Sequence, residues 1–354
     1  MEPRIEGRRN PLPVGVGAAL AAAVLFGAST PLAKLLVGQV APLVLAGLLY
    51  LGSGTGLGLA CLVRGQRGTE ARLRRADAPW LAGAVLFGGA LGPALLMTGL
   101  LRTTAASASL LLNMEGVFTA LLAWHVFHEN FDRRIAAGMA LIVAGGVLLS
   151  WQGSAGISPG ALAILGACLC WAIDNNLTQR VSAADPLAVA GIKGAVAGPV
   201  NLGIGLAAGG ALPEAPGLLA SLLVGFLGCG VSLACFVAAL RHLGTARTGA
   251  YFSTAPFVGA AVSLLVLREP VGTAFWMAAL LMGAGVWLHL TERHTHEHAH
   301  GHLEHSHRHV HDAHHRHAHG PDDPEGEPHT HHHVHLPLTH SHAHYPDIHH
   351  RHRH

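Results

Sequence analysis

Four formally charged residues lie well inside otherwise apolar stretches of this 354-residue chain: Lys34, Glu115, Asp174 and Lys193. If those stretches cross a membrane, each charge costs about 2.5–3.5 kcal/mol at the bilayer centre, so it has to face a cavity or a partner. Asp174 and Lys193 come at comparable depths in neighbouring stretches, which predicts an ion pair. Such a pair either joins two helices or gives way to a substrate or a proton. Lys34 is close enough to the end of its stretch to extend toward the membrane surface.

Glu115 lies near the middle of its stretch, and Asn113, two residues away, falls on a different face of a helix. A buried carboxylate without a partner exchanges protons readily. We therefore expect Glu115 either to couple solute movement to a proton or cation, or to be a hydrogen-bonded structural acid. The candidate set for substrate binding and coupling is Glu115, Asp174, Lys193, Asn113, Asn175, Asn176, Ser29 and Thr30.

Histidine supplies a second kind of chemistry, because all but four of the 29 histidines lie in the last 64 residues. They alternate with other residues, so imidazoles recur at i, i+2 and i+4, within reach of one ion in an extended chain. Imidazole suits Zn²⁺, Ni²⁺, Co²⁺ and Cu²⁺; we expect the tail to bind such ions, while the rest of the chain requires no cofactor. With almost no apolar content, the tail is predicted to be disordered. The candidate metal ligands are His294, His296, His298, His300, His302, His305, His307, His309, His311, His331, His332, His333, His340, His342 and His344.

Membrane-spanning helices have to position these residues. Apolar types make up 51% of the chain and charged types 12%, and the mean hydropathy is +0.40, which excludes an ordinary soluble domain. A span needs about 20 mainly apolar residues. The sequence therefore predicts an all-α integral membrane protein of ten transmembrane helices. The ten segments are 14–37, 42–63, 80–101, 104–126, 133–151, 159–179, 186–208, 218–240, 245–267 and 272–290.

The distribution of arginine predicts the orientation. Thirteen arginines outside the tail fall on the same side as the N-terminus, and only Arg102 and Arg268 fall on the other side. Because positively charged loops stay in the cytoplasm, both termini are expected there. The preference for arginine over lysine is typical of a GC-rich bacterial genome, so we expect a multi-pass protein of the bacterial inner membrane. We expect no nucleic-acid partner. The oligomeric state stays open, with a homodimer as one alternative.

The sequence contains an internal repeat. Segment 111–130 aligns with 251–270 at a shift of 140, so that Glu129 meets Glu269. LFGASTPLAK in the first span matches CWAIDNNLTQ in the sixth at a shift of 145. Each half has five helices, an odd number, so the halves insert with opposite orientations, as in many secondary transporters. The predicted domains are a cytoplasmic N-terminal tail (1–13), two five-helix repeats (14–151 and 159–290) and the histidine-rich cytoplasmic tail (291–354).

These repeated segments resemble the drug/metabolite transporter superfamily, in particular its EamA-type members, over residues 14–290. The residues that carry the resemblance are Phe26-Gly27, Trp171-Ala172, Glu129 and Glu269. The first half departs from the pattern at Glu115-Gly116, where a proline often follows in the family, whereas Pro256 keeps that proline in the second half. The resemblance implies a ten-helix transporter. It does not name the cargo, since the superfamily moves amino acids, sugars, nucleotide-sugars, cations and drugs.

Three functions remain compatible with the sequence. The first is a secondary-active transporter of a divalent transition-metal cation such as Zn²⁺, Ni²⁺ or Co²⁺, with the tail as a buffer or sensor of the ion. The second is an exporter of an organic metabolite or drug whose tail is incidental or regulatory. The third is a membrane-anchored metal store or sensor. No nucleophile motif, phosphate-binding glycine loop or HExxH sequence is present, so we expect no enzyme activity.

Overall fold

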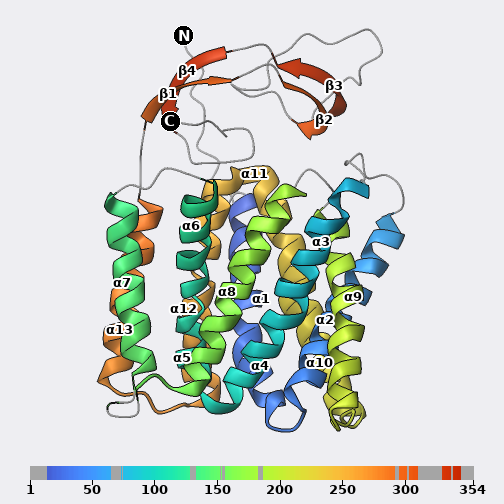
Figure 1. Ribbon diagram of the computed structural model, residues 1–354, viewed down its shortest axis with the longest axis vertical. Coiled ribbons are helices and arrows are strands. Elements are labelled where there is room, and N and C mark those ends of the chain that lie inside the picture. Colours follow the sequence, from blue (N-terminus) through green and yellow to red (C-terminus); the bar gives the residue numbers. More distant parts are fainter. Residues whose placement is uncertain are drawn as a thin grey trace, which may run out of the picture.

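The computed structural model describes residues 14–64, 73, 75–127, 133–151, 153, 156–181 and 186–291, together with four strands between 295 and 343. Figure 1 shows the helices as one bundle whose members run roughly parallel to the vertical of the view. The first half contains α1 (Val14–Val37), α2 (Pro42–Arg64), η2 (Arg75–Asp77), α3 (Ala78–Ala84), η3 (Val85–Leu91), α4 (Gly92–Arg102), α5 (Ala105–Leu111), α6 (Met114–Phe127) and α7 (Arg133–Ser150). The second half contains α8 (Pro159–Arg180), α9 (Pro186–Ala207), α10 (Ala215–Gly225), η5 (Phe226–Val231), α11 (Ser232–Phe252), α12 (Ala255–Val262), η6 (Ser263–Leu267) and α13 (Thr273–Leu290).

Eight helical segments of the described chain are long and apolar enough to cross a membrane. Two shorter apolar helices, Ala255–Leu267 and Thr273–Leu288, correspond to the ninth and tenth predicted spans. The structure thus confirms the predicted all-α membrane protein. Helices are the expected solution because lipid offers no partner to a backbone N–H or C=O group, and a helix satisfies those groups within its own segment.

The predicted boundary between the eighth and ninth spans is wrong. We expected a loop at 241–244, but α11 continues as a helix through these residues to Phe252. This segment contains no proline, so nothing in it removes a backbone hydrogen bond. The helix is interrupted instead at Ser253–Thr254, just before Pro256, a residue that a helix accepts in its first turn.

Irregular helix geometry recurs at equivalent places in the two halves. A π-helical segment interrupts the third span at Val85–Leu91 and the eighth at Phe226–Val231. A turn breaks the fourth span at Leu112–Asn113, and the equivalent turn precedes α12 at Ser253–Thr254. The packing repeats as well: α1 packs on α11 and α12 as α8 packs on α4 and α6. The contacts α2–α9 and α7–α13 join equivalent helices of the two halves.

The tail contains four short strands: β1 (Thr295–His300), β2 (Leu303–His309), β3 (His329–His335) and β4 (Leu338–Ala343). β1 pairs with β4 and β2 with β3, both antiparallel, and Figure 1 shows the strands beyond one end of the bundle. The structure therefore differs from the predicted disordered tail at these four stretches. The period-two alternation of the tail suits a strand, and pairing satisfies the backbone without an apolar core.

Glycines bring α2, α9 and α10 into backbone contact. A Cβ atom on Gly54 would lie 2.6 Å from the backbone nitrogen of Ala195, and one on Gly194 would lie 2.6 Å from the backbone of Gly54. A Cβ atom on Gly225 would lie 2.0 Å from the carbonyl oxygen of Leu49. Helices in lipid attract each other mainly through such close packing, because lipid tails are as apolar as leucine.

Replacing Gly54 with valine should therefore destabilise the bundle by about 1–3 kcal/mol, the usual cost of overpacking. Gly58, one helical turn farther along α2, has no atom within 4 Å of an added Cβ and provides the matched control. We expect Gly54→Val to lower the unfolding temperature in detergent and Gly58→Val to leave it nearly unchanged. Equal unfolding temperatures for the two variants would contradict the packing described above.

Candidate functional site

Helix α8 carries the largest group of predicted functional residues. It contacts α3, η3, α4 and α6 of the first half, so it lies at the interface of the two repeats, and it occupies the middle of the bundle in Figure 1. Substrate sites of transporters built from inverted repeats lie at this kind of interface. Within little more than two turns, α8 presents Trp171, Asp174, Asn175 and Thr178 to different neighbours.

The predicted ion pair between Asp174 and Lys193 forms. Lys193 Nζ donates to Asp174 Oδ1 at 2.6 Å and to Oδ2 at 2.5 Å, which joins α8 to α9. Thr178 Oγ1, one turn along α8, also donates to Asp174 Oδ1 at 2.9 Å. The Asp174 side chain is 8% exposed and that of Lys193 16%. Burying one of these charges without the other would cost several kcal/mol, so the pair is stable only while closed or while other charges replace its members.

Gly88 of η3 makes room for this pair. A Cβ atom at Gly88 would lie 1.9 Å from Asp174 Oδ2, so no larger residue fits there. The carbonyl oxygen of Gly88 accepts hydrogen bonds from Tyr50 Oη at 2.7 Å and from Trp171 Nε1 at 3.0 Å. Asn201, which is 1% exposed, donates to the next carbonyl of η3 at 3.0 Å. The π-helical segment thus supports the ion pair. No role for Tyr50, Gly88 or Asn201 was expected from the sequence.

Glu115 has a partner that the sequence did not reveal. Asn175 Nδ2 donates to Glu115 Oε1 at 2.8 Å and approaches Thr119 Oγ1 at 3.4 Å. Glu115 lies in the first turn of α6, directly after the break at Leu112–Asn113, where the helix dipole favours a negative charge. Asn175 is exposed and Glu115 half-buried, so this hydrogen bond is more accessible than the neighbouring ion pair. This hydrogen bond is compatible with both predicted roles of Glu115, the coupling acid and the structural acid.

Three of the remaining candidates donate to carbonyls of their own spans. Asn113 Nδ2 donates to the carbonyl of Leu110 at 2.9 Å, across the break in the fourth span. Asn176 Nδ2 donates to the carbonyl of Ala172 at 2.8 Å, and Ser29 Oγ to that of Phe26 at 2.6 Å. Thr30 is 4% exposed in α1. The structure therefore does not join Asn113, Asn176, Ser29 or Thr30 to the ion pair by any of these bonds.

Lys34, in the last turn of α1, binds the C-terminal end of α4. Its Nζ donates to the carbonyl of Leu100 and, at 2.9 Å, to that of Thr103, which satisfies acceptors at the C-terminal end of α4. This contact ties α1 to the segment that connects α4 with α5.

Glu269 binds the start of α5, on the other side of the same connection. Its two carboxylate oxygens accept hydrogen bonds from the backbone nitrogens of Ala105 and Ala106, each at 2.8 Å, at the start of α5. The preceding residue, Arg268, has a positive φ of 51°, which ends η6 and turns the chain into this contact. The boundary glutamate of the second repeat is thus a helix cap for the first repeat. Its counterpart Glu129 lies outside the described residues.

Among residues whose side chains the structure describes, no group of three His, Cys, Asp or Glu residues comes together to hold a metal ion. Of the predicted tail ligands, His294, His302, His311 and His344 lie outside the described residues, and the other predicted tail ligands are described by their backbone alone.

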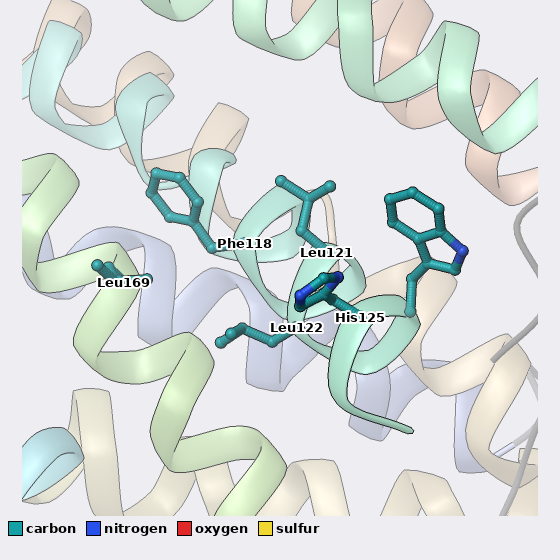
Figure 2. Close-up of a pocket in the computed structure, with 6 residues that line it drawn as sticks. Phe118, Leu121, Leu122, His125 and Leu169 are labelled. Carbon is teal, nitrogen blue, oxygen red and sulfur yellow. The ribbon is translucent and has the colours of Figure 1, made fainter. Parts of the chain in front are cut away.

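A shallow groove of about 400 Å³ runs between α6 and α8. Figure 2 shows its walls, and its lining residues are Phe118, Leu121, Leu122, Trp124, His125 and Leu169. Leu121 is 37% exposed and Leu169 43%, so the groove opens to the outside of the helices. A mainly apolar groove of this kind suits hydrocarbon chains better than a charged solute.

Comparison with known proteins agrees with this architecture. Residues 13–151 and 158–291 each match the family described as the EamA-like transporter family. An uncharacterized transporter of Methanothermobacter thermautotrophicus is 28% identical over 76% of this chain and 84% of its own length. A probable 4-amino-4-deoxy-L-arabinose-phosphoundecaprenol flippase subunit, ArnE, of Pseudomonas paraeruginosa is 44% identical over 24% of this chain and 70% of its own length. A solved crystal structure shares the fold, with a TM-score of 0.57, 21% identity, and coverage of 77% of this chain and 95% of that one.

The cap that Glu269 provides can be tested against Glu214, which precedes α10 but makes no side-chain capping bond. Glu269→Ala should lower the free energy of unfolding by about 0.5–2 kcal/mol, the usual cost of losing a helix cap. Glu214→Ala should change it little. The measurement is thermal unfolding of both purified variants in one detergent, and a loss of the same size in Glu214→Ala would contradict the assigned cap.

Proposed function

Because this chain belongs to the EamA-like transporter family, we propose that it is a secondary-active transporter of a small organic solute carrying both a positive and a negative group. The observation that carries the proposal is the closed, buried ion pair of Asp174 and Lys193 at the interface of the two repeats. In the proposed cycle, the solute replaces the internal partners: its cationic group binds Asp174 and its anionic group binds Lys193.

The charge balance of the pair favours such a solute over a divalent cation. A metal ion bound to Asp174 would leave Lys193 unpaired and repel it, at a cost of several kcal/mol for the buried charge. A solute with an amino group and an acidic group leaves neither residue unpaired during the exchange. The ArnE relatives support this chemistry, since the name of their lipid-linked sugar contains an amino and a phosphate group.

Glu115 and Asn175 are the proposed coupling elements. Asn175 follows Asp174 directly in α8, so a movement of α8 that opens the ion pair also moves the amide that donates to Glu115. A carboxylate that loses its donor in an apolar span takes up a proton more readily. Solute binding at the ion pair would thereby be linked to proton uptake at the start of α6.

The histidine-rich tail favours a second candidate function, in which the cargo is a divalent transition-metal cation and the tail buffers or senses it. A third, the membrane-anchored metal store or sensor, predicts metal binding without flux. For each candidate we infer a location in the bacterial inner membrane with both termini in the cytoplasm, on the basis of the thirteen arginines that share the side of the N-terminus.

Transport into proteoliposomes distinguishes these candidates. Full-length protein and a version ending at Leu290 should both exchange labelled neutral amino acids or amino-sugar phosphates, and neither should carry Zn²⁺, Ni²⁺ or Co²⁺. The double variant Asp174→Asn, Lys193→Gln keeps hydrogen-bonding groups but removes both charges, so solute exchange should fall roughly tenfold or more. Asn176→Ala, which alters an amide bonded to its own helix, is the control and should retain exchange. Metal flux in both lengths of protein, or full exchange by the double variant, would refute the organic-solute proposal.

Glu115→Gln should separate binding from coupling. The amide still offers an oxygen to Asn175 but cannot exchange a proton, so uptake driven by a pH gradient should fall by roughly tenfold or more. Exchange of labelled for unlabelled solute without a gradient should persist and serves as the internal control. If gradient-driven uptake is as fast in Glu115→Gln as in the wild type, Glu115 is not the coupling residue.

A further inference from the structure

The groove between α6 and α8 follows α6 lengthwise. Its wall on α6 runs from Phe118 to His125, and Leu169 belongs to its wall on α8 (Figure 2). With a rise of about 1.5 Å per residue, Phe118 and His125 lie about 10 Å apart along the helix axis. The groove therefore leads from one depth in the membrane to another, and its two ends have different surroundings.

The end of the groove at Trp124 and His125 lies at the level expected for the membrane surface. Trp124 is 45% exposed and comes shortly before the end of α6 at Phe127. Tryptophan is enriched where lipid head groups meet the hydrocarbon core. Because the spans alternate in direction, Trp80 at the start of α3 and Trp287 near the end of α13 lie at the same end of the bundle, and both are exposed. One end of the groove is thus at the level of the lipid head groups.

The other end of the groove adjoins the hydrogen bond between Asn175 and Glu115. Phe118, which is half-buried and packs against the hydrophobic core, lies one helical turn after Glu115 in α6. The next residue, Thr119, has its Oγ1 3.4 Å from Nδ2 of Asn175. Asn175 directly follows Asp174 of the ion pair in α8. The groove therefore connects the level of the lipid head groups with the polar groups beside the ion pair.

We propose that the groove holds the single alkyl chain of an amphiphilic zwitterion whose amino and acidic groups bind Asp174 and Lys193. The solute of the proposed function, on which this inference rests, is then an amphiphile. Moving an alkyl chain out of hydrocarbon into a polar space costs free energy for every methylene group. Such a solute therefore enters the bundle where its chain stays against an apolar surface while its head group moves inward. Leu121, 37% exposed, and Leu169, 43% exposed, provide that surface on the two walls of the groove.

Competition for exchange in proteoliposomes that hold the full-length protein tests this role of the groove. Exchange of labelled alanine is inhibited either by unlabelled alanine or by α-aminododecanoic acid, which has the same amino and carboxylate groups and a decyl side chain. Leu169→Trp and Leu121→Trp each place a larger side chain in one wall of the groove. Leu162→Trp is the matched control: Leu162 is 52% exposed and lies two turns from Leu169 on the same face of α8, but it does not line the groove.

In the wild type and in Leu162→Trp, α-aminododecanoic acid should halve the exchange at a concentration roughly tenfold or more below that of unlabelled alanine, because burying even two methylene groups supplies such a factor. In Leu169→Trp and Leu121→Trp the two competitors should act at similar concentrations. The ratio of the two concentrations is taken within each variant, so a change in the variant's own exchange rate cancels.

The same large ratio in all four proteins would show that the chain dissolves in bulk lipid, and it would overturn the alkyl-chain groove. Loss of alanine exchange in both groove variants would overturn it too, since the groove would then serve solutes without a chain. A wild-type ratio near one, with alanine exchange intact, would refute the groove and leave the proposed function standing. A wild type that exchanges neither alanine nor amino-sugar phosphates would refute the proposed function itself.

Discussion

A lysine and an aspartate remain charged inside a membrane-spanning bundle only when each neutralises the other, and much of the packing around α8 follows from that requirement. The carboxylate of Asp174 reaches Lys193 only because Gly88 has no side chain in its way. Gly88 in turn lies in a π-helical segment whose carbonyls are bonded by Tyr50, Trp171 and Asn201. Gly88, the π-helical segment η3 and the three side chains that donate to its carbonyls thus all support the buried ion pair of Asp174 and Lys193.

The equivalent contact, between α1 and η5, has the same close packing as the contact between α8 and η3, but an uncharged serine takes the place of Asp174. The internal alignment pairs Ser29 with Asp174, and the second π-helical segment contains Gly228. A Cβ atom on Gly228 would lie 2.4 Å from the Cβ atom of Ser29, so α1 packs on η5 as α8 packs on η3. Ser29, however, donates only to its own helix. The two repeats share a scaffold, and the ion pair of Asp174 and Lys193 belongs to the second of them.

The spans and the ion pair could be predicted from the sequence because both depend on local properties: hydropathy along the chain and the depth of each charge within its span. The bond between Asn175 and Glu115 could not, since it depends on how α6 is rotated after the break at Leu112–Asn113. The partners of Lys34 are backbone carbonyls, and because every residue has one, the residue types do not reveal this contact. The tail strands escaped prediction because the lack of apolar residues argued for disorder, while the period-two pattern and the register argue for pairing.

The two parts of the fourth span are held by different contacts. Its first part, α5, is held at its start by both oxygens of Glu269, and Lys34 holds the end of α4 beside it. Its second part, α6, begins after the turn at Leu112–Asn113, where the amide of Asn113 donates to the carbonyl of Leu110. Glu115 lies in the first turn of α6, and its donor Asn175 directly follows Asp174 of the ion pair. In the proposed cycle, a motion of α8 that opens the pair would therefore act on Glu115 through Asn175, because Asp174 and Asn175 are consecutive in one helix.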